Sequence, residues 1–388
     1  MPNKKFFDII FSTNHFRGGR FDLQKLFRNQ EIRDFNQEEL MLRTISKFRN
    51  DLMTEVGTDK SLEVTFGFNI TSSLNFLLNV LPNDIVTSVS EFLPVITMIE
   101  KSSRKIASYI DLSTSSANKI IRLRKIQKKE IVLLITHIAY SDGQDVLSSI
   151  LDDRNLLAYL SDYKVHIIID GAHAIGNNYM ISDIVKIKKS VSDKITLASF
   201  TYIFDCYKWL QGIWGMSIIV SDLKEVIQSH DFIFPNGRDN NDKHRHSFSE
   251  PVPSSFNPSL ICWFLNAKMV EENMKTLKRG VLKNKKLTHS FLKTFKANEI
   301  RNISVVYHEE NHQNNIISLR VGNPAHLHSY LYENNFVSHL IAQREIKIGT
   351  ILRHFPGSVR LCFSSDLIKA TDIVGIIKIL KKYDRQII

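Results

Sequence analysis

Two segments decide the fold of this chain: HIIIDGAHAIGN at residues 166–177 and FDCYKWLQGIWGMSIIV at residues 204–220. In the first, an apolar β-branched run ends at Asp170, and His173 follows in the next turn. In the second, Lys208 lies among aromatic residues, between two apolar runs that predict strands. Ligand sites in open α/β sheets lie beyond the carboxyl ends of the strands, so Asp170 is a candidate for such a site.

Each segment also has a plain structural interpretation. A strand-end aspartate can simply cap the turn that follows it. Lys208 can pack its aliphatic stem on the neighbouring aromatic rings while its ammonium reaches water. In the functional interpretation, burial lowers the pKa of the lysine, and the neutral amine becomes a nucleophile for Schiff-base chemistry.

Outside these segments, short β-branched runs alternate with amphipathic stretches. The first part of the chain predicts strands at 62–66, 84–89, 105–110, 131–135, 165–170, 194–200 and 216–220, and helices at 37–56, 71–81, 116–127 and 145–151. This alternation predicts βαβ units and a mostly parallel sheet. From about Pro258 a long helix runs to about 298, and an α+β pattern follows with strands near 303–307, 315–320 and 358–363 and a helix at 369–383.

The length and composition predict two domains. The chain has 388 residues, of which 43% are hydrophobic and 23% charged, so it can bury a sizeable core and is not globally disordered. We expect a large domain over about 30–270. The smaller domain is expected to combine the N-terminal arm, 1–29, with residues 271–388.

The net charge indicates the kind of ligand, and the cysteines indicate the cellular compartment. The net charge of +11 favours an anionic ligand. The lysines are spread over helical faces and no nucleic-acid-binding motif is present, so no nucleic-acid partner is expected. Three scattered cysteines without a paired motif indicate a reducing, cytoplasmic location. No apolar run approaches the roughly 18 residues of a membrane span, so no membrane association is expected.

One motif has the spacing of a zinc site but is interpreted as having no metal-binding role. Residues 308–312 spell His-Glu-Glu-Asn-His, the spacing that binds zinc when it lies on a helix. Here it stands between two strand-like runs, which is typical of a hairpin turn, so we expect no metal site.

Taken together, the Asp170–His173 and Lys208–Leu210 segments resemble the class V aminotransferase family of pyridoxal-phosphate enzymes, which includes cysteine desulfurases, kynureninases and isopenicillin-N-epimerase-like proteins. The segments 67–81, 88–99 and 357–373 are similar to further parts of the family pattern, in the same order. The resemblance implies an α/β chain with the pyridoxal-phosphate transferase type I fold. In that fold a large domain with a mostly parallel sheet flanked by helices carries a smaller α+β C-terminal domain.

The resemblance also implies roles at the cofactor ring. Lys208 would form a Schiff base with pyridoxal 5′-phosphate and then move the substrate's Cα proton. Asp170 would pair with the pyridine nitrogen and keep it protonated, which makes the ring an electron sink. His173 would contact the ring hydroxyl, and Phe92 would stack on the ring.

Further residues are implied for the cofactor phosphate. Thr71 and Ser72 open a helix, whose N-terminus favours an anion, although a plain helix cap explains them too. Tyr207 would offer its phenol to the same phosphate. Ser255 would reach the phosphate of the neighbouring subunit, which implies a homodimer with shared active sites.

Two residues are candidates for binding an amino-acid substrate. Arg360 matches the family arginine that binds the α-carboxylate, for which the planar guanidinium fork is suited. The alternative is a surface arginine on an edge strand. His15, in the N-terminal arm, is expected to reach over the site, and a solvated arm is the alternative.

The resemblance leaves the reaction open. Asp205 stands where the family often has Ser or Asn, and a carboxylate there repels phosphate unless it turns away. The stretch 322–359 has no cysteine, which disfavours desulfuration through a persulfide. We expect a pyridoxal-phosphate-dependent transferase or lyase acting on an amino acid through Lys208. The alternatives are a kynureninase-like hydrolase, an epimerase, or a scaffold that has lost its cofactor.

Overall fold

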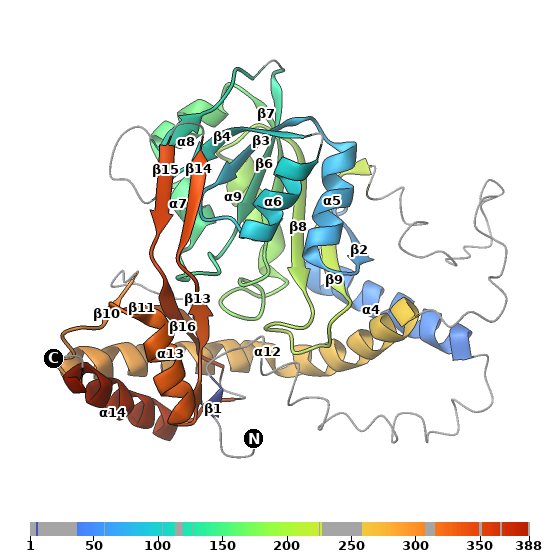
Figure 1. Ribbon diagram of the computed structural model, residues 1–388. Coiled ribbons are helices and arrows are strands. Elements are labelled where there is room, and N and C mark those ends of the chain that lie inside the picture. The colour runs from blue at the N-terminus through green and yellow to red at the C-terminus, as the bar shows by residue number, and fades with distance from the viewer. Residues whose placement is uncertain are drawn as a thin grey trace.

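The structure is a computed structural model, shown in Figure 1, that describes residues 5–6, 37–57, 59–102, 104–112, 119–126, 128–224, 226, 258–306, 315–348, 351–364 and 367–386. The predicted site residues His15 and Ser255 lie outside the described residues, and so does the His308–His312 motif.

An eight-stranded sheet forms the centre of the larger unit (Figure 1). Its spatial order is β2 (Glu63–Gly67), β9 (Ser217–Ser221), β8 (Leu197–Asp205), β7 (Lys164–Asp170), β6 (Glu130–Thr136), β3 (Asp84–Ser88), β4 (Lys105–Ile110) and β5 (Ile120–Arg122). The five strands from β8 to β4 are mutually parallel, while β9 and β5 run antiparallel to their neighbours. Since β2 is antiparallel to β9, it points the same way as β8.

Helices cover both faces of this sheet (Figure 1), as follows: α4 (Gln37–Val56), α5 (Ile70–Val80), α6 (Leu93–Lys101), α7 (Val146–Leu151), α8 (Arg154–Leu160) and α9 (Asp183–Ser192). Successive residues of β7 show why both faces need a cover. Ile167 and Ile169 belong to the apolar cluster on one face, and Ile168 to the cluster on the other. A parallel sheet buried on both faces accounts for the continuous apolar runs in the sequence.

A smaller α+β unit follows. The 40-residue helix α12 (Pro258–Ala297) leads into an antiparallel sheet of β10 (Ser304–Val305), β11 (Ile316–Arg320), β16 (Ser358–Cys362) and β13 (His339–Ile341). The helices α13 (Pro324–Glu333) and α14 (Ala370–Gln386) also belong to this unit. Near the N-terminus, β1 (Lys5–Phe6) pairs in parallel with β12 (Phe336–Val337).

A two-stranded hairpin links the two units. It consists of β14 (Arg344–Ile348) and β15 (Ile351–Phe355), and Figure 1 shows it rising from the smaller unit toward the large sheet. At the base of the hairpin, where Arg344 pairs with Phe355, the Phe355 side chain packs against the apolar cluster that contains Ile168. The hairpin therefore adds an apolar contact between the two units.

Most predicted elements are present, and the α/β fold class is confirmed. One predicted helix is wrong: residues 120–122 of the segment 116–127 form the edge strand β5 instead. Ile120 and Ile121 pair with Ile110 and Tyr109 of β4, so two adjacent apolar residues serve a strand rather than one helical stripe. The predicted strand 194–200 also continues as β8 to Asp205.

The proposed domain division stays a prediction. Its boundary at residue 270 falls inside α12, which continues without a break to Ala297. Early in this helix Trp263 lies near Phe66 of the large sheet, while further along Phe291 packs on Phe363 of the smaller unit. The helix is thus common to both units. Within the described part of the chain, no helix is long and apolar enough to cross a membrane.

Candidate active site

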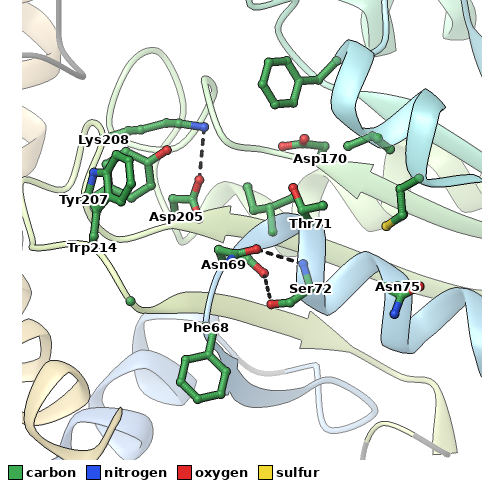
Figure 2. Close-up of a pocket in the computed structure, with 15 residues that line it drawn as sticks. Phe68, Asn69, Thr71, Ser72, Asn75, Asp170, Asp205, Tyr207, Lys208 and Trp214 are labelled. Carbon is green, nitrogen blue, oxygen red and sulfur yellow. Dashed lines mark hydrogen bonds and ion pairs between the residues drawn. The ribbon is translucent and has the colours of Figure 1, made fainter. Parts of the chain in front are cut away.

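A cavity of about 890 Å³ opens at the edge of the large sheet where its parallel strands end. Its walls combine carboxylates, one lysine, hydroxyls and large apolar groups (Figure 2), contributed by Phe68, Asn69, Ile70, Thr71, Ser72, Asn75, Phe92, Val95, Met98, Asp170, Asp205, Tyr207, Lys208, Trp214 and Gly215. The predicted residues Asp170, Lys208, Phe92, Thr71, Ser72 and Tyr207 are therefore brought together.

Strand direction explains this convergence. β7 ends at Asp170 and β8 at Asp205, and the two strands are parallel neighbours, with Asp170 opposite Ile203. β2 points the same way and ends at Gly67. Ser217 of β9 pairs with both Gly67 and Asp205, so the ends of β2 and β8 flank the same residue.

The amine of Lys208 forms an ion pair with Asp205. Lys208 Nζ lies 3.0 Å from Asp205 Oδ2, and the two side chains are only 12% and 4% exposed (Figure 2). The amine also lies 5.4 Å from the centre of the Tyr207 ring. Burial alone lowers the pKa of Lys208, but Asp205, Tyr207 and Asp170 outweigh it and raise the pKa above its usual value. The expectation of a lowered pKa is therefore wrong, because the lysine is buried together with carboxylates.

Asp170 is the second carboxylate in the cavity. It is 5% exposed, and its Oδ1 accepts a hydrogen bond of 2.8 Å from the backbone amide of Ala172. Burial raises the pKa of Asp170 to about 6, although Lys208 and the Ala172 amide act in the opposite direction. Even with Lys208 nearby, the group is therefore not fully ionised at neutral pH, and a further cation beside it would favour the ionised form.

The N-terminus of α5 forms another wall. Asn69 caps the helix: its Oδ1 accepts from the Ser72 amide at 2.8 Å, and its carbonyl accepts from the Ser73 amide at 3.0 Å. The helix lies close against the sheet, because Ser73 Oγ is 2.9 Å from Ser217 Oγ and a Cβ on Gly67 would collide with Ser73 Oγ. Glycine at position 67 therefore allows this close approach.

Aromatic side chains surround the mouth of the cavity. Phe92 precedes α6 and is 39% exposed, and its ring centre lies 5.1 Å from that of Tyr140 in an edge-to-face contact. Trp214 is 57% exposed, and its ring centre lies 5.3 Å from the ring centre of Tyr207. Phe68 is also half-exposed. Large apolar groups in such numbers around a cavity are typical of a ligand or interface site.

Two predicted residues lie outside the cavity lining. His173 is 4% exposed, and its Nδ1 is 3.4 Å from the indole nitrogen of Trp209, which donates to it. Burial, Lys208 and Arg360 lower its pKa well below the usual value, so the ring is neutral. Arg360 is fully buried on β16, and its Nη1 donates to the Tyr140 carbonyl at 2.8 Å. Through Tyr140, Arg360 is connected to Phe92 at the cavity mouth.

The sequence interpretation missed Trp214, Phe68 and Asn69. Asn69 carried a readable signal, since asparagine is a preferred N-cap and the predicted helix began two residues later. Trp214 and Phe68 carried none, because neither belongs to a periodic pattern. Among the described residues, no group of three or more His, Cys, Asp or Glu side chains is placed to hold a metal ion.

No family model matches the sequence, and no curated protein matches it. Solved structures are similar over almost the whole chain. 8-Amino-7-oxononanoate synthase from Francisella tularensis has a TM-score of 0.63 at 12% identity, covering 100% of this chain and 99% of that one. Cysteine desulfurase from Thermococcus onnurineus NA1 has a TM-score of 0.62 at 15% identity, with 99% and 96% covered. A mutant of C-DES with glycine covalently linked to its PLP cofactor has a TM-score of 0.65 at 13% identity, with 98% and 96% covered.

These similarities confirm the predicted fold. The chain has the type I fold of pyridoxal-phosphate-dependent transferases, with an eight-stranded sheet and a smaller α+β unit. At identities of 15% or less they establish the architecture, whereas the reaction depends on the residues in the cavity.

Proposed function

We propose that this chain is a pyridoxal-phosphate-dependent enzyme of the class V aminotransferase type, acting on an amino acid as a transferase or lyase. The observation that carries the proposal is the position of Asp170 and Lys208. Both face one cavity from the ends of neighbouring parallel strands, with the Phe92 ring in the same lining.

The residues present fit an aromatic aldehyde cofactor. Ile70, Val95 and Met98 supply apolar wall for a ring, and Asp170 supplies a buried carboxylate for a protonated ring nitrogen. Lys208 is the only amine among the residues that line the described cavity, and it is the point of covalent attachment. When bound, pyridoxal phosphate supplies the electron sink on which carbanion chemistry at an amino acid depends.

The chain's own groups have separate tasks. Asp170 would pair with a protonated ring nitrogen, and that cation would lower the Asp170 pKa from about 6, since opposite charges favour the ionised form. Lys208 must release a proton before it attaches, and its raised pKa means that attachment is favoured by higher pH. As a free amine, Lys208 would be the group that moves the proton at the substrate's Cα.

The proposed phosphate site lies at the start of α5. Thr71, Ser72 and Tyr207 line the cavity on the same side as the helix N-terminus, and the Ser72 hydroxyl, which now donates to the Asn69 carbonyl at 3.0 Å, would have to turn to reach a phosphate. Ser255 of a second copy is proposed to complete it, which makes the enzyme a homodimer. Sedimentation equilibrium should then give twice the 44.8 kDa of one chain. A cytoplasmic location remains part of the proposal.

The substrate contacts are proposed from the family pattern. Arg360 is proposed for the substrate carboxylate and His15 for a contact from the N-terminal arm. His173 is proposed to contact the cofactor ring hydroxyl. Arg360 already holds the Tyr140 carbonyl, so replacing it would also disturb the loop next to Phe92. An Arg360→Lys variant should therefore raise KM for the substrate and weaken cofactor binding as well.

Desulfuration by a cysteine thiol is disfavoured. Cys206 and Cys362 are buried, and burial raises the pKa of Cys206 well above its usual value. We therefore propose a transaminase or lyase reaction, with kynureninase-like hydrolysis and epimerisation as alternatives. Spectral changes of the loaded protein against a panel of amino acids would distinguish them.

Cofactor binding tests the proposal directly. The full chain mixed with pyridoxal 5′-phosphate should develop an absorption band at about 400–430 nm, a property of the bound cofactor. Borohydride should then fix the cofactor's mass on the peptide that contains Lys208. Lys208→Ala should abolish the fixed mass. Lys186→Ala should not, since its side chain is 79% exposed in an ion pair on α9.

The second candidate is a binding scaffold without cofactor. Asp205 favours it, because a carboxylate inside the cavity opposes a phosphate. The titration decides when it is repeated with the unphosphorylated aldehyde, pyridoxal: a wild-type chain that gives no band and no fixed mass with either aldehyde would support the scaffold and overturn the enzyme.

A further inference from the structure

Asp205 lies inside the cavity rather than turning away from it. It ends β8, and its partner Ser217 also pairs with Gly67, the residue that leads into the N-terminus of α5. Asp205 and the first turn of α5 thus flank the same point of β9. Figure 2 shows the Asp205 carboxylate between Lys208 and Asn69, and all three line the cavity.

The Asp205 carboxylate is partly satisfied. Its Oδ2 pairs with Lys208, while its Oδ1 is buried and has no hydrogen-bond partner among the described residues. Asp170 is a second carboxylate in the same lining. The described lining thus carries two carboxylates and one ammonium, so it opposes a further anion.

The N-terminus of α5 is the part of the lining best suited to a phosphate, because its amides point along the helix axis. Asn69 already accepts from the Ser72 amide, which leaves less of that end for an incoming group. A phosphate there would compete with the Asn69 cap and face the carboxylate of Asp205. A ligand with a neutral hydroxymethyl group in place of the phosphate would meet neither obstacle.

We propose that Asp205 is a specificity-determining residue that weakens binding of the phosphorylated aldehyde, pyridoxal 5′-phosphate, relative to its unphosphorylated form, pyridoxal. The inference rests on the proposed function, since both aldehydes are taken to attach at Lys208. It assigns Asp205 a part in choosing the form of the cofactor, besides its ion pair with the lysine.

The test compares two ligands on the same protein. Wild-type chain and Asp205→Asn are titrated with pyridoxal 5′-phosphate and with pyridoxal, and the dissociation constants are taken from the absorption band. Loss of the ion pair changes the Lys208 amine equally for both ligands, so the ratio of the two constants isolates the phosphate. The ratio should shift toward the phosphorylated form by roughly tenfold or more, as expected for removing one charge near an anion in a partly buried site.

Two variants make the result decisive. Asp205→Glu keeps the charge and should leave the ratio within about twofold of wild type. Asp205→Ser replaces Asp205→Asn if that variant does not fold. A band whose ratio is unchanged in the neutral variants would overturn the inference about Asp205 alone. No band with either aldehyde in any protein would overturn the proposed function, and the inference with it.

Discussion

Asn177 and Asn315 are joined by two hydrogen bonds that connect the segment at the end of β7, which carries the candidate site residues Asp170 and His173, to the smaller unit. The backbone N–H of Asn315 donates to Asn177 Oδ1 at 3.0 Å, and the side-chain Nδ2 of Asn315 donates to the backbone carbonyl of Asn177 at 2.7 Å. Asn177 Nδ2 in turn donates to the His173 carbonyl at 2.7 Å. Thr288 of α12 donates to Asn315 Oδ1 at 2.9 Å. The turn after β7 is therefore held by residues far along the chain.

This network predicts an effect of Asn315→Ala on stability. Both asparagines are fully buried, so the change leaves the Asn177 carbonyl and the Thr288 hydroxyl without this partner. The free energy of unfolding in urea should fall by about 2 kcal/mol. Asn334→Ala is the control, since Asn334 Nδ2 only meets the Tyr330 carbonyl one helical turn away. Equal losses in both variants would contradict a special role for the network.

Local patterns in the sequence predicted most of the large sheet. The helix at 37–56 and the strand at 105–110 have the predicted bounds, because each is a continuous pattern with clear ends. The segment 116–127 failed, because edge pairing with β4 outweighs its helical appearance. The strands 336–337, 339–341, 344–348 and 351–355 were missed, since short strands leave little periodicity to read.

The residues of the candidate site that could be placed from the sequence are those that lie at or just after the end of a strand. Asp170 and Lys208 follow apolar runs, so their common edge can be inferred from strand direction. The surroundings of Arg360 and His173 could not be inferred, because the Tyr140 carbonyl and the Trp209 ring come from other segments. The raised pKa of Lys208 likewise depends on which carboxylates the fold places beside it.

Asp170 predicts a pH-dependent stability. Its pKa in the folded state is about 6, above the ordinary 3.8, so the folded state binds this proton more tightly than the unfolded state does. The stability contributed by the proton is complete below about pH 4 and is lost as pH rises through about 6. Without cofactor, Asp170→Asn should therefore be more stable than wild type at pH 8, by roughly 3 kcal/mol at most, and gain little at pH 4.

Asp153→Asn is a control of opposite sign. Burial alone raises the pKa of Asp153, but Lys119 and the amides of Leu156 and Asn155 lower it overall. Stability from this carboxylate is present above its unfolded pKa and lost in acid. Asp153→Asn should thus be less stable than wild type at pH 8. Urea unfolding at both pH values measures the two variants, and a loss of stability in Asp170→Asn at pH 8 would argue against a buried charge there.

The Lys208–Asp205 pair predicts a double-mutant effect in the protein without cofactor. Lys208→Met leaves two buried carboxylates without their cation and should destabilise the fold by about 3 kcal/mol at pH 8. Adding Asp205→Asn should recover at least half of that loss, because one uncompensated charge is gone. Lys186→Met, in an exposed pair with Asp183, should change stability by less than about 0.5 kcal/mol. A double variant no more stable than Lys208→Met would show that the pair is not coupled.

Gly67 predicts a link between backbone packing and the proposed phosphate site. A methyl group at this position would collide with Ser73 Oγ and press α5 away from β9, so Gly67→Ala should destabilise the fold by about 2 kcal/mol and weaken binding of pyridoxal 5′-phosphate. Ser73→Ala in the same chain should restore part of both, since it removes the colliding oxygen. Gly280→Ala is the matched control: nothing lies within 4 Å of its added methyl group in α12, so the same change should stabilise the helix by about 1 kcal/mol. Unfolding in urea measures the stability, and the cofactor titration measures binding. A Gly67→Ala chain that binds pyridoxal 5′-phosphate as tightly as wild type would argue against a phosphate site at the N-terminus of α5.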